Sequence, residues 1–148
     1  MMPPRIFTCI CQAAVIMALV LLAPFGRAST TPDVNYNGHY EMVDLKAARV
    51  FSLKVKQTKH DADVTFSAAM ADGSGPAPDG AGKGRIEKGV LSFKFKDSFN
   101  NEGTCTLQPS LGATPGLYQL SITVTKAVDP SPFHFYGSVL LKKAPDRP

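Results

Sequence analysis

Histidine and carboxylate side chains stand together in the segment His60-Asp61-Ala62-Asp63. An imidazole and two carboxylates within four residues are donors that a divalent cation accepts. The segment also separates two runs of alternating apolar residues, where a polar turn is the ordinary arrangement. His39 and His134 stand far away along the chain and complete no ligand spacing. We therefore expect a solvated turn here and no metal ligands.

The segment Asp72–Lys83 is rich in glycine, proline, serine and aspartate, as phosphate-binding and calcium-binding loops are. Neither motif is complete. A phosphate-binding loop that ends at Gly82-Lys83 requires glycine at position 77 and serine or threonine at position 84, where this chain has Ala77 and Gly84. Two prolines stand where an EF-hand needs oxygen ligands. We expect the longest surface loop of the protein, and the one most able to move.

The sequence completes no motif for a catalytic nucleophile, and a glycosidase-like pair of carboxylates remains an open alternative. Cys105 alternates in register with Leu107 on the apolar side of a strand pattern, which predicts a buried thiol. No serine stands in a Gly-x-Ser-x-Gly turn. Asp97 follows a strand pattern, and we expect it to hydrogen-bond Ser98 or Asn100 in a turn rather than to act as a general acid. These features predict a protein that is not an enzyme, with no catalytic residues and no cofactor.

A period of two in hydrophobicity recurs along the chain and predicts β-strands. It is clearest in Leu91–Lys96, where three large apolar residues alternate with serine and two lysines. We expect eight strands, at residues 38–44, 49–56, 64–70, 85–86, 91–96, 104–107, 118–125 and 133–141, with one helical turn at 45–48. The side chains expected to face inward are Phe51, Leu53, Val55, Phe66, Ala68, Met70, Leu91, Phe93, Phe95, Cys105, Leu120, Ile122 and Val124.

Eight short strands joined mostly by short connections pair with their neighbours in sequence as an up-and-down meander. Such a sheet hides its apolar face and its two edges when it curls until the last strand meets the first. We therefore predict an all-β fold, a single closed or nearly closed antiparallel barrel. A two-sheet β-sandwich is the alternative, because the binary pattern fits both.

The first residues have the features of a signal peptide. Arg5 is followed by eleven apolar residues from Ala13 to Ala23, within the roughly 7–15 of a signal-peptide core and short of the roughly 20 that span a bilayer. Small residues precede a cleavage point after Ala28. The expected organisation is a signal peptide (1–28), a flexible leader (29–37), a barrel domain (38–143) and a tail (144–148). An uncleaved anchor beginning near Ile6 is the alternative, and either reading predicts a periplasmic or secreted protein.

The charge balance is weak evidence for a charged partner. Without Arg5 and Arg27, the 16 basic residues fall to 14, against 12 acidic ones. The lysines are spread along strand faces and not clustered as in a nucleic-acid-binding surface. We therefore expect no nucleic-acid partner and no stable membrane insertion after cleavage. Nothing in the sequence predicts an oligomeric state.

The chain resembles the lipocalin-like (calycin) β-barrels of small secreted bacterial proteins. Gly38-His39-Tyr40 stands where lipocalins have Gly-x-Trp at the start of the first strand. Lys142 and Lys143 close the last strand, where that family often has a basic residue. The resemblance spans Gly38 to Lys143. It implies that a ligand or a partner binds at one end of the barrel.

The predicted function is non-catalytic binding. The inward side chains are bulky and fill the middle of an eight-stranded barrel, which leaves a shallow pocket at one end as the expected site. Tyr40, Tyr118 and Tyr136 are the candidate ligand-binding residues, because each joins an apolar ring to a hydroxyl. The partner is a small apolar ligand. The alternative is a periplasmic inhibitor or other interaction protein acting through its rim loops, and a hydrolase is the least favoured class.

Overall fold

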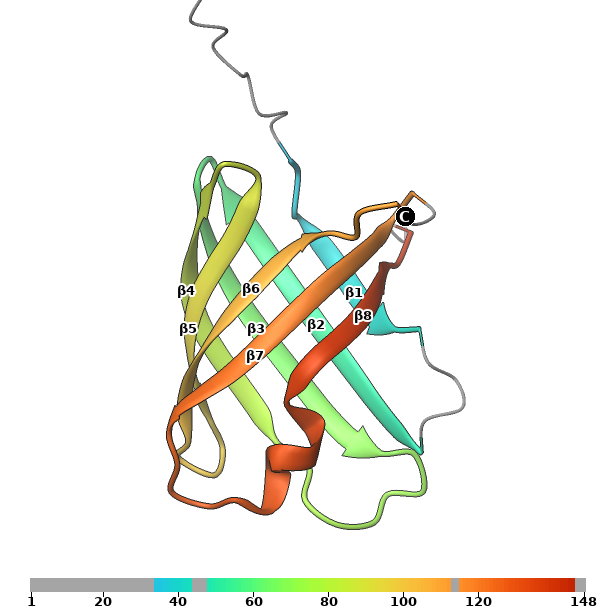
Figure 1. Cartoon of the computed structure of the whole chain (residues 1–148), viewed down its shortest axis with the longest axis vertical. Helices are drawn as coiled ribbons and strands as arrows, with labels where there is room; N and C mark the ends of the chain where they lie inside the picture. Colours follow the sequence, from blue (N-terminus) through green and yellow to red (C-terminus); the bar gives the residue numbers. More distant parts are fainter. Residues whose placement is uncertain (1–33, 44–47, 113–114, 146–148) are drawn as a thin grey trace, which may run out of the picture. The chain divides into compact units, whose positions relative to one another are not determined.

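The computed structural model describes residues 34–43, 48–112 and 115–145. Within them eight antiparallel strands pair in sequence order, and the last strand pairs with the first to close a barrel (Figure 1). The expected all-β meander and its closure are confirmed, and the alternative β-sandwich is wrong. The elements are β1 (Gly38–Met42), β2 (Arg49–Thr58), β3 (Asp61–Met70), β4 (Asp79–Glu87), β5 (Val90–Asp97), β6 (Glu102–Pro109), β7 (Leu117–Lys126), the 3-10 helix η1 (Ser131–Phe135) and β8 (Gly137–Lys143).

The interior is filled by the side chains that the period of two predicted. In β2, Phe51, Leu53 and Val55 are at most 4% exposed, while Lys54 and Lys56 between them point to solvent. Of the thirteen side chains expected inside, eleven are buried, and Met70 and Val124 are half-buried toward strand ends. The core is therefore continuous through the barrel, with no second layer beneath the sheet.

Strand β4 is longer than expected. It begins at Asp79, so the prediction of a loop from Asp72 to Lys83 is wrong for its last five residues. Gly80, Gly82 and Gly84 occupy its inward positions, and a Cβ at Gly80 would lie 2.3 Å from the Phe66 ring. A Cβ at Gly82 would lie 1.9 Å from the carbonyl oxygen of Lys94. Glycine at these positions lets β4 lie directly against large side chains, so the glycines mark a closely packed strand.

The last strand begins later than expected. The pattern predicted a strand from Phe133 to Leu141, but Ser131–Phe135 forms η1 and β8 starts at Gly137. A proline at the start of η1 suits the first turn of a helix, where no backbone N–H is required. The turn carries Phe135 into the core, where it is 1% exposed. The apolar residues of η1 therefore cover the lower end of the barrel and do not extend β8.

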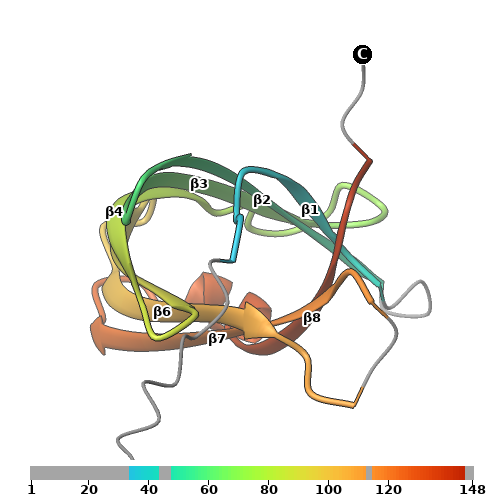
Figure 2. The same cartoon turned by 90° about the horizontal axis from the view of Figure 1, so that it is seen from above.

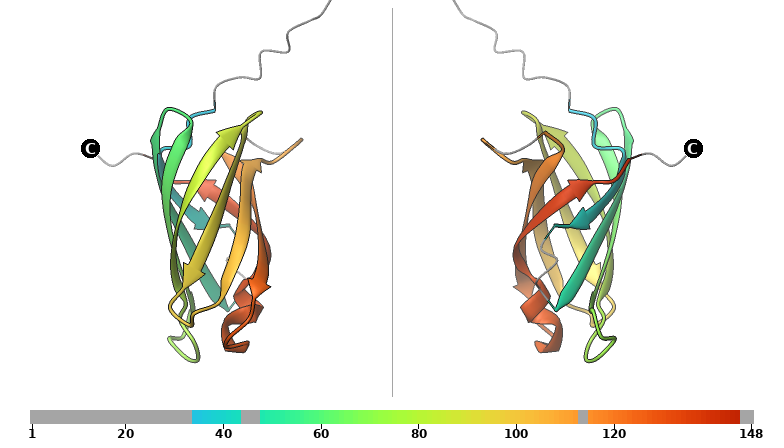
Figure 3. Two further views of the ribbon diagram at one scale, coloured as in Figure 1. Left: turned by 90° about the vertical axis from the view of Figure 1, so that its left-hand side faces the viewer. Right: turned by 90° about the vertical axis from the view of Figure 1, so that its right-hand side faces the viewer.

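The barrel has two ends with different connections (Figures 1 and 3). The upper end carries the β2–β3 and β4–β5 turns and the β6–β7 loop. The lower end carries the β3–β4 loop, the β5–β6 turn and η1. Positive φ angles at Lys59 (58°), Lys88 (51°) and Asn100 (63°) allow the chain to reverse tightly in the three turns.

The segment Val34–Asn37, called the N-terminal segment below, passes over the upper end (Figure 2). Tyr36 is 0% exposed and its hydroxyl donates a hydrogen bond to the carbonyl of Gly89 at 2.7 Å. Its backbone N–H donates to Oε1 of Gln57 at 2.7 Å. Residues 34–37 were expected to belong to a flexible leader, and the structure corrects this, because Tyr36 is a core residue.

Other predictions fall on residues outside those that the structure describes. They are the signal peptide (1–28), the first part of the leader (29–33) and most of the helical turn expected at 45–48. No helix in the described residues is long and apolar enough to cross a membrane.

Candidate ligand-binding site at the lower end of the barrel

Two of the three candidate tyrosines meet at the upper end. The rings of Tyr40 and Tyr118 contact edge to face, with centroids 5.0 Å apart, and Tyr36 lies 5.9 Å from Tyr118. The Tyr40 hydroxyl donates to the Tyr36 carbonyl at 2.8 Å. Burial raises the pKa of Tyr36 to about 12 and also raises the pKa of Tyr40. The hydroxyls of Tyr36 and Tyr40 are thus used within the protein, and this end of the barrel is packed.

Tyr136 lies at the other end of the barrel. Its ring centroid is 5.7 Å from that of Phe95 and 6.4 Å from that of Phe66. Its hydroxyl donates to Oδ2 of Asp97 at 2.5 Å. Burial, followed by this hydrogen bond to the carboxylate, raises the pKa of Tyr136. The three candidate tyrosines therefore do not form one pocket, and their part in ligand binding stays a prediction.

Asp97 has the turn-forming role that its position predicted, with different partners. It is 5% exposed, and Oδ1 accepts hydrogen bonds from the backbone N–H groups of Phe99 (2.9 Å) and Asn101 (2.8 Å). Oδ2 accepts from the Asn101 amide (2.9 Å) as well as from Tyr136. Ser98 and Asn100 were the expected donors, but neither donates to this carboxylate in the structure. With four donors on its two oxygens, the carboxylate is committed to the fold.

The two motifs that carry the lipocalin-like resemblance lie against each other. Tyr40 of β1 pairs with Lys143 of β8, and the Lys143 ammonium stands 5.9 Å from the centre of the Tyr40 ring. A Cβ at Gly38 would lie 2.7 Å from Cε of Lys143. Glycine therefore leaves room for the lysine side chain to cross the start of β1. The same ammonium donates to the Asn35 carbonyl at 3.1 Å, which ties the N-terminal segment to the closure of the barrel.

The other reactive side chains considered in the sequence are buried, paired or located in a turn. Cys105 is 2% exposed, as predicted, and burial raises the pKa of its thiol to about 12. His60 stands exposed in the β2–β3 turn, and Asp63 beside it binds the Lys83 ammonium at 3.0 Å. Within the described residues no three His, Cys, Asp or Glu side chains gather at a spacing that suits a metal ion.

The lower end has a hollow of about 640 Å³, the size of a small-molecule site. It exists because β1 is short: pairing between β1 and β2 ends at Glu41 and Ser52, so Arg49–Phe51 extend beyond β1. We call it the lower hollow. Most of its lining is apolar or small, and its residues are Glu41, Met42, Arg49, Val50, Phe51, Ser52, Ser67, Ala68, Ala69, Ala71, Ala77 and Asp79.

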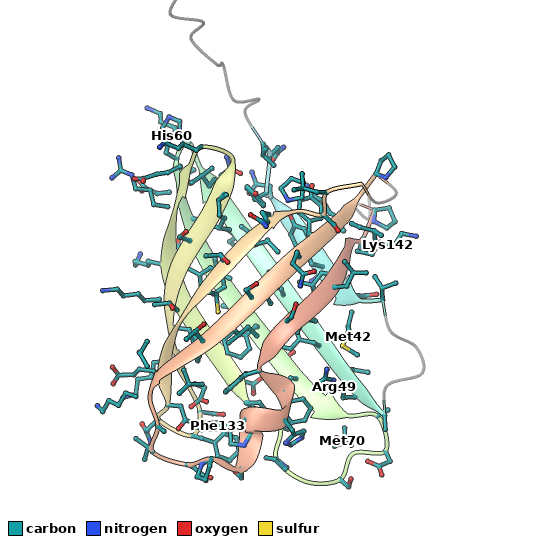
Figure 4. The ribbon with its side chains drawn as sticks, viewed as in Figure 1. Met42, Arg49, His60, Met70, Phe133 and Lys142 are labelled. Carbon is teal, nitrogen blue, oxygen red and sulfur yellow. The ribbon has the colours of Figure 1, made fainter. Side chains whose placement is uncertain are left out.

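Arg49 is the cation of the lower hollow. It occupies an inward position of β2, two residues before Phe51, and is half-buried. One of its terminal nitrogens donates to the His134 carbonyl in η1, so the side chain reaches across the lower end (Figure 4). A guanidinium has five N–H donors, and the others remain to bind an acceptor on a ligand. Glu41 and Asp79 place carboxylates in the same lining.

Sequence reasoning missed the lower hollow, although one signal was present. Arg49 is in register with the core residues of its strand, and a charged residue at an inward position marks either a strand end or a site. The contributions of Ala71 and Ala77 depend on the path of the β3–β4 loop, which no local pattern predicts. Tyr36 was missed for a similar reason, because a single aromatic residue in a polar segment shows no periodicity.

Comparison with known proteins adds a likeness in fold. A search with the sequence finds no matching family model and no matching curated protein. Among solved structures, the chain is similar to a de novo designed fluorescence-activating β-barrel, with 13% sequence identity and a TM-score of 0.47. The match covers 74% of this chain and 94% of the designed one.

Proposed function

We propose that this protein is a non-catalytic, exported binding module that holds a small ligand in the lower hollow. The observation that carries the proposal is the hollow itself, with a mostly apolar or small lining, one arginine from an inward strand position, and the carboxylates of Glu41 and Asp79. This combination suits a molecule with an apolar body and one hydrogen-bond-accepting or anionic end. The site differs from the tyrosine set expected from the sequence, because the hydroxyls of Tyr40 and Tyr136 are engaged inside the protein.

The absence of catalysis is part of the proposal, and three groups support it. The Asp97 carboxylate already accepts four hydrogen bonds. The Cys105 thiol is buried, and its pKa of about 12 keeps it protonated at neutral pH. Asp63 is paired with a lysine at the surface. The groups that chemistry would use are therefore occupied or inaccessible. Export rests on the signal-peptide pattern of residues 1–28.

The second candidate function is protein binding through the rim loops, as in an inhibitor of a foreign hydrolase. One observation favours it: the middle of the barrel is filled, since β4 lies against Phe66 and Phe93 through its glycines. A filled barrel does not carry a ligand in its centre. At the lower rim, η1 presents Phe133 and His134, an aromatic pair of the kind that protein partners bind.

Titration with 1-anilinonaphthalene-8-sulfonate, which joins an apolar body to an anionic group, tests the proposed ligand site. We expect saturable binding to one site, measured by fluorescence at pH 7 on protein whose native near-ultraviolet circular dichroism is intact. Native mass spectrometry of protein purified from a secreting host should also detect a co-purifying small molecule. A protein that shows neither a bound mass nor a saturable response is better explained by rim-loop binding.

A matched pair of variants locates the site. Ala71→Phe fills the lower hollow from an exposed loop position and should weaken dye binding at least about tenfold, a loss of about 1.4 kcal/mol. Thr104→Phe adds the same ring on the outer face of β6, away from the hollow, and should leave binding unchanged. Equal affinities for the two variants would place the dye elsewhere.

A further inference from the structure

The glycines of β4 also shape the outside of the barrel. Because Gly80, Gly82 and Gly84 let β4 lie against the interior rings, the outer surface over β3 and β4 is hollowed. A hollow of about 710 Å³ lies there, and another of about 320 Å³ lies above it toward the β2–β3 turn. We call the two together the outer furrow. Its lining includes small and hydroxyl side chains, among them Ser52, Thr65, Ser67 and Ala81, and also carboxylates, Asp79 and Asp97 in the larger hollow and Asp61 and Asp63 in the smaller one.

Lysines stand on both sides of the outer furrow. In one row of the sheet, Lys54 of β2 and Lys96 of β5 flank Thr65 and Ala81. In the next row, Lys56 and Lys94 flank Asp63 and Lys83. Strands are about 4.8 Å apart, so each pair of flanking lysines is separated by roughly 14 Å at the backbone, and the two rows by roughly 7 Å. The arrangement is a trough with two cations along each bank.

Two of the bank lysines stand opposite a carboxylate in the strand register, Lys56 opposite Asp63 and Lys96 opposite Glu102, but these carboxylates bind Lys83 and Lys126 instead. Among the described residues, no carboxylate lies within 4.0 Å of the ammonium groups of Lys54, Lys56, Lys94 or Lys96. Lys83 differs, since it binds Asp63 at 3.0 Å. Lys83 also stands directly opposite Lys94, and two like charges in such a pair repel each other. An anion in the outer furrow would relieve this repulsion.

We propose that the outer furrow binds an acidic polysaccharide, a linear chain that carries carboxylate or sulfate groups. A linear chain fits an elongated trough better than the curved surface of a globular protein does. The bank lysines pair with its anionic groups, and Ser52, Thr65 and Ser67 hydrogen-bond its hydroxyls. The outward positions of β2–β5 hold no aromatic side chain on which nucleic-acid bases would stack. The outer furrow does not include Arg49, although Ser52, Ser67 and Asp79 line both the outer furrow and the lower hollow.

Fluorescence anisotropy of fluorescein-labelled oligogalacturonate at pH 7 tests the proposal. We expect saturable binding, weakened about tenfold in the double variant Lys54→Gln, Lys96→Gln because two ion pairs are lost. The control double variant Lys88→Gln, Lys142→Gln removes the same charge from the β4–β5 turn and from β8, where neither lysine lines the outer furrow, and should change affinity less than about twofold. Figure 4 shows Lys142 on β8, away from β4. Equal losses in the two double variants would overturn the proposal, because net charge alone would then explain binding.

The floor of the outer furrow gives a second test that leaves every charge in place. Ala81→Leu fills the trough and should weaken binding at least about fivefold, whereas Thr123→Leu on the outer face of β7 should not. Labelled dextran, a neutral polymer, should not bind. Labelled single-stranded DNA that binds as tightly as oligogalacturonate, with the same dependence on the bank lysines, would overturn the choice of partner.

Discussion

Asn101 shows how much one buried amide organises at the lower end. It is 0% exposed, and its Oδ1 accepts hydrogen bonds from the backbone N–H groups of Val128 (2.7 Å) and Asp129 (2.9 Å). Its amide nitrogen donates to Asp97. One side chain thus joins the β5–β6 turn to the segment that leads into η1. No local pattern in the sequence indicates the contact with the second segment.

Replacing Asn101 by alanine should lower the free energy of unfolding by about 2–4 kcal/mol. Two backbone donors would lose their acceptor, and Oδ2 of Asp97 would lose one of its two donors. Each buried group left unpaired costs about 1–3 kcal/mol, and contact with water recovers part of that cost. Urea denaturation followed by circular dichroism measures the change. The control is Asn100→Gly, at the exposed residue next to Asn101, where glycine can keep the positive φ. Its free energy of unfolding should stay within about 0.5 kcal/mol of that of the parent protein. Equal midpoints for the two variants would contradict the network.

The Cys105 thiol should resist alkylation in the native protein. Burial raises its pKa from 9.0 to about 12, so at pH 8 the native thiolate fraction is roughly a thousandfold below that of the unfolded chain. The raised pKa stabilises the fold fully below pH 9, and this contribution is lost as the pH rises toward 12. Iodoacetamide labelling with and without denaturant measures the difference. Rapid native labelling at pH 8 would show that β6 is shifted by one residue.

At the scale of elements, periodicity predicted the strands that carry large apolar side chains and failed where the inward residues are glycine. β5 and β7 were placed correctly because phenylalanine, leucine and isoleucine alternate with polar residues. β4 has the same alternation in Gly80, Gly82 and Gly84, but glycine carries no hydrophobic signal, and its neighbours resemble a loop. The beginning of β8 was wrong because Phe133 and Phe135 belong to a 3-10 turn that packs one of them inward.

Gly82→Ala should destabilise the barrel by about 3 kcal/mol or more. The new methyl group would overlap the carbonyl oxygen of Lys94, so β4 and β5 would have to move apart at this point. Ala81→Ser changes the adjacent outward residue by a similar volume and should stay within about 0.5 kcal/mol. Thermal unfolding monitored by circular dichroism compares the two. A Gly82→Ala protein as stable as the control would mean that β4 does not lie against the interior.

At the scale of the whole molecule, the architecture was predictable and the site was not. Eight consecutive amphipathic strands leave few ways to bury one face, so the closed meander follows from the sequence. The lower hollow depends on where a short strand ends and how a loop folds back, and the outer furrow depends on how closely β4 approaches the core. Both are consequences of packing among residues distant in sequence, such as Phe66 and Gly80.

The N-terminal segment belongs to the cooperative unit. A chain that starts at Ser29, the expected product of signal-peptide cleavage, keeps Tyr36 and should unfold in a single transition. A chain that starts at Gly38 lacks this buried ring and should be less stable by about 3–5 kcal/mol. A third chain, from Ser29 with Tyr36→Phe, loses only the hydroxyl and should lie between them. Equal stability of the first two chains would mean that residues 34–37 do not stabilise the barrel.

The closure of the barrel brings the two ends of the described part of the chain together. Lys143 binds the Asn35 carbonyl at 3.1 Å, and the Ala144 N–H donates to the His39 carbonyl at 2.8 Å, so the beginning and the end of the barrel lie at the same rim. A short glycine-serine linker can therefore join residue 145 to residue 34. New termini opened in the exposed β3–β4 loop would preserve every strand pair, which makes this barrel suited to circular permutation.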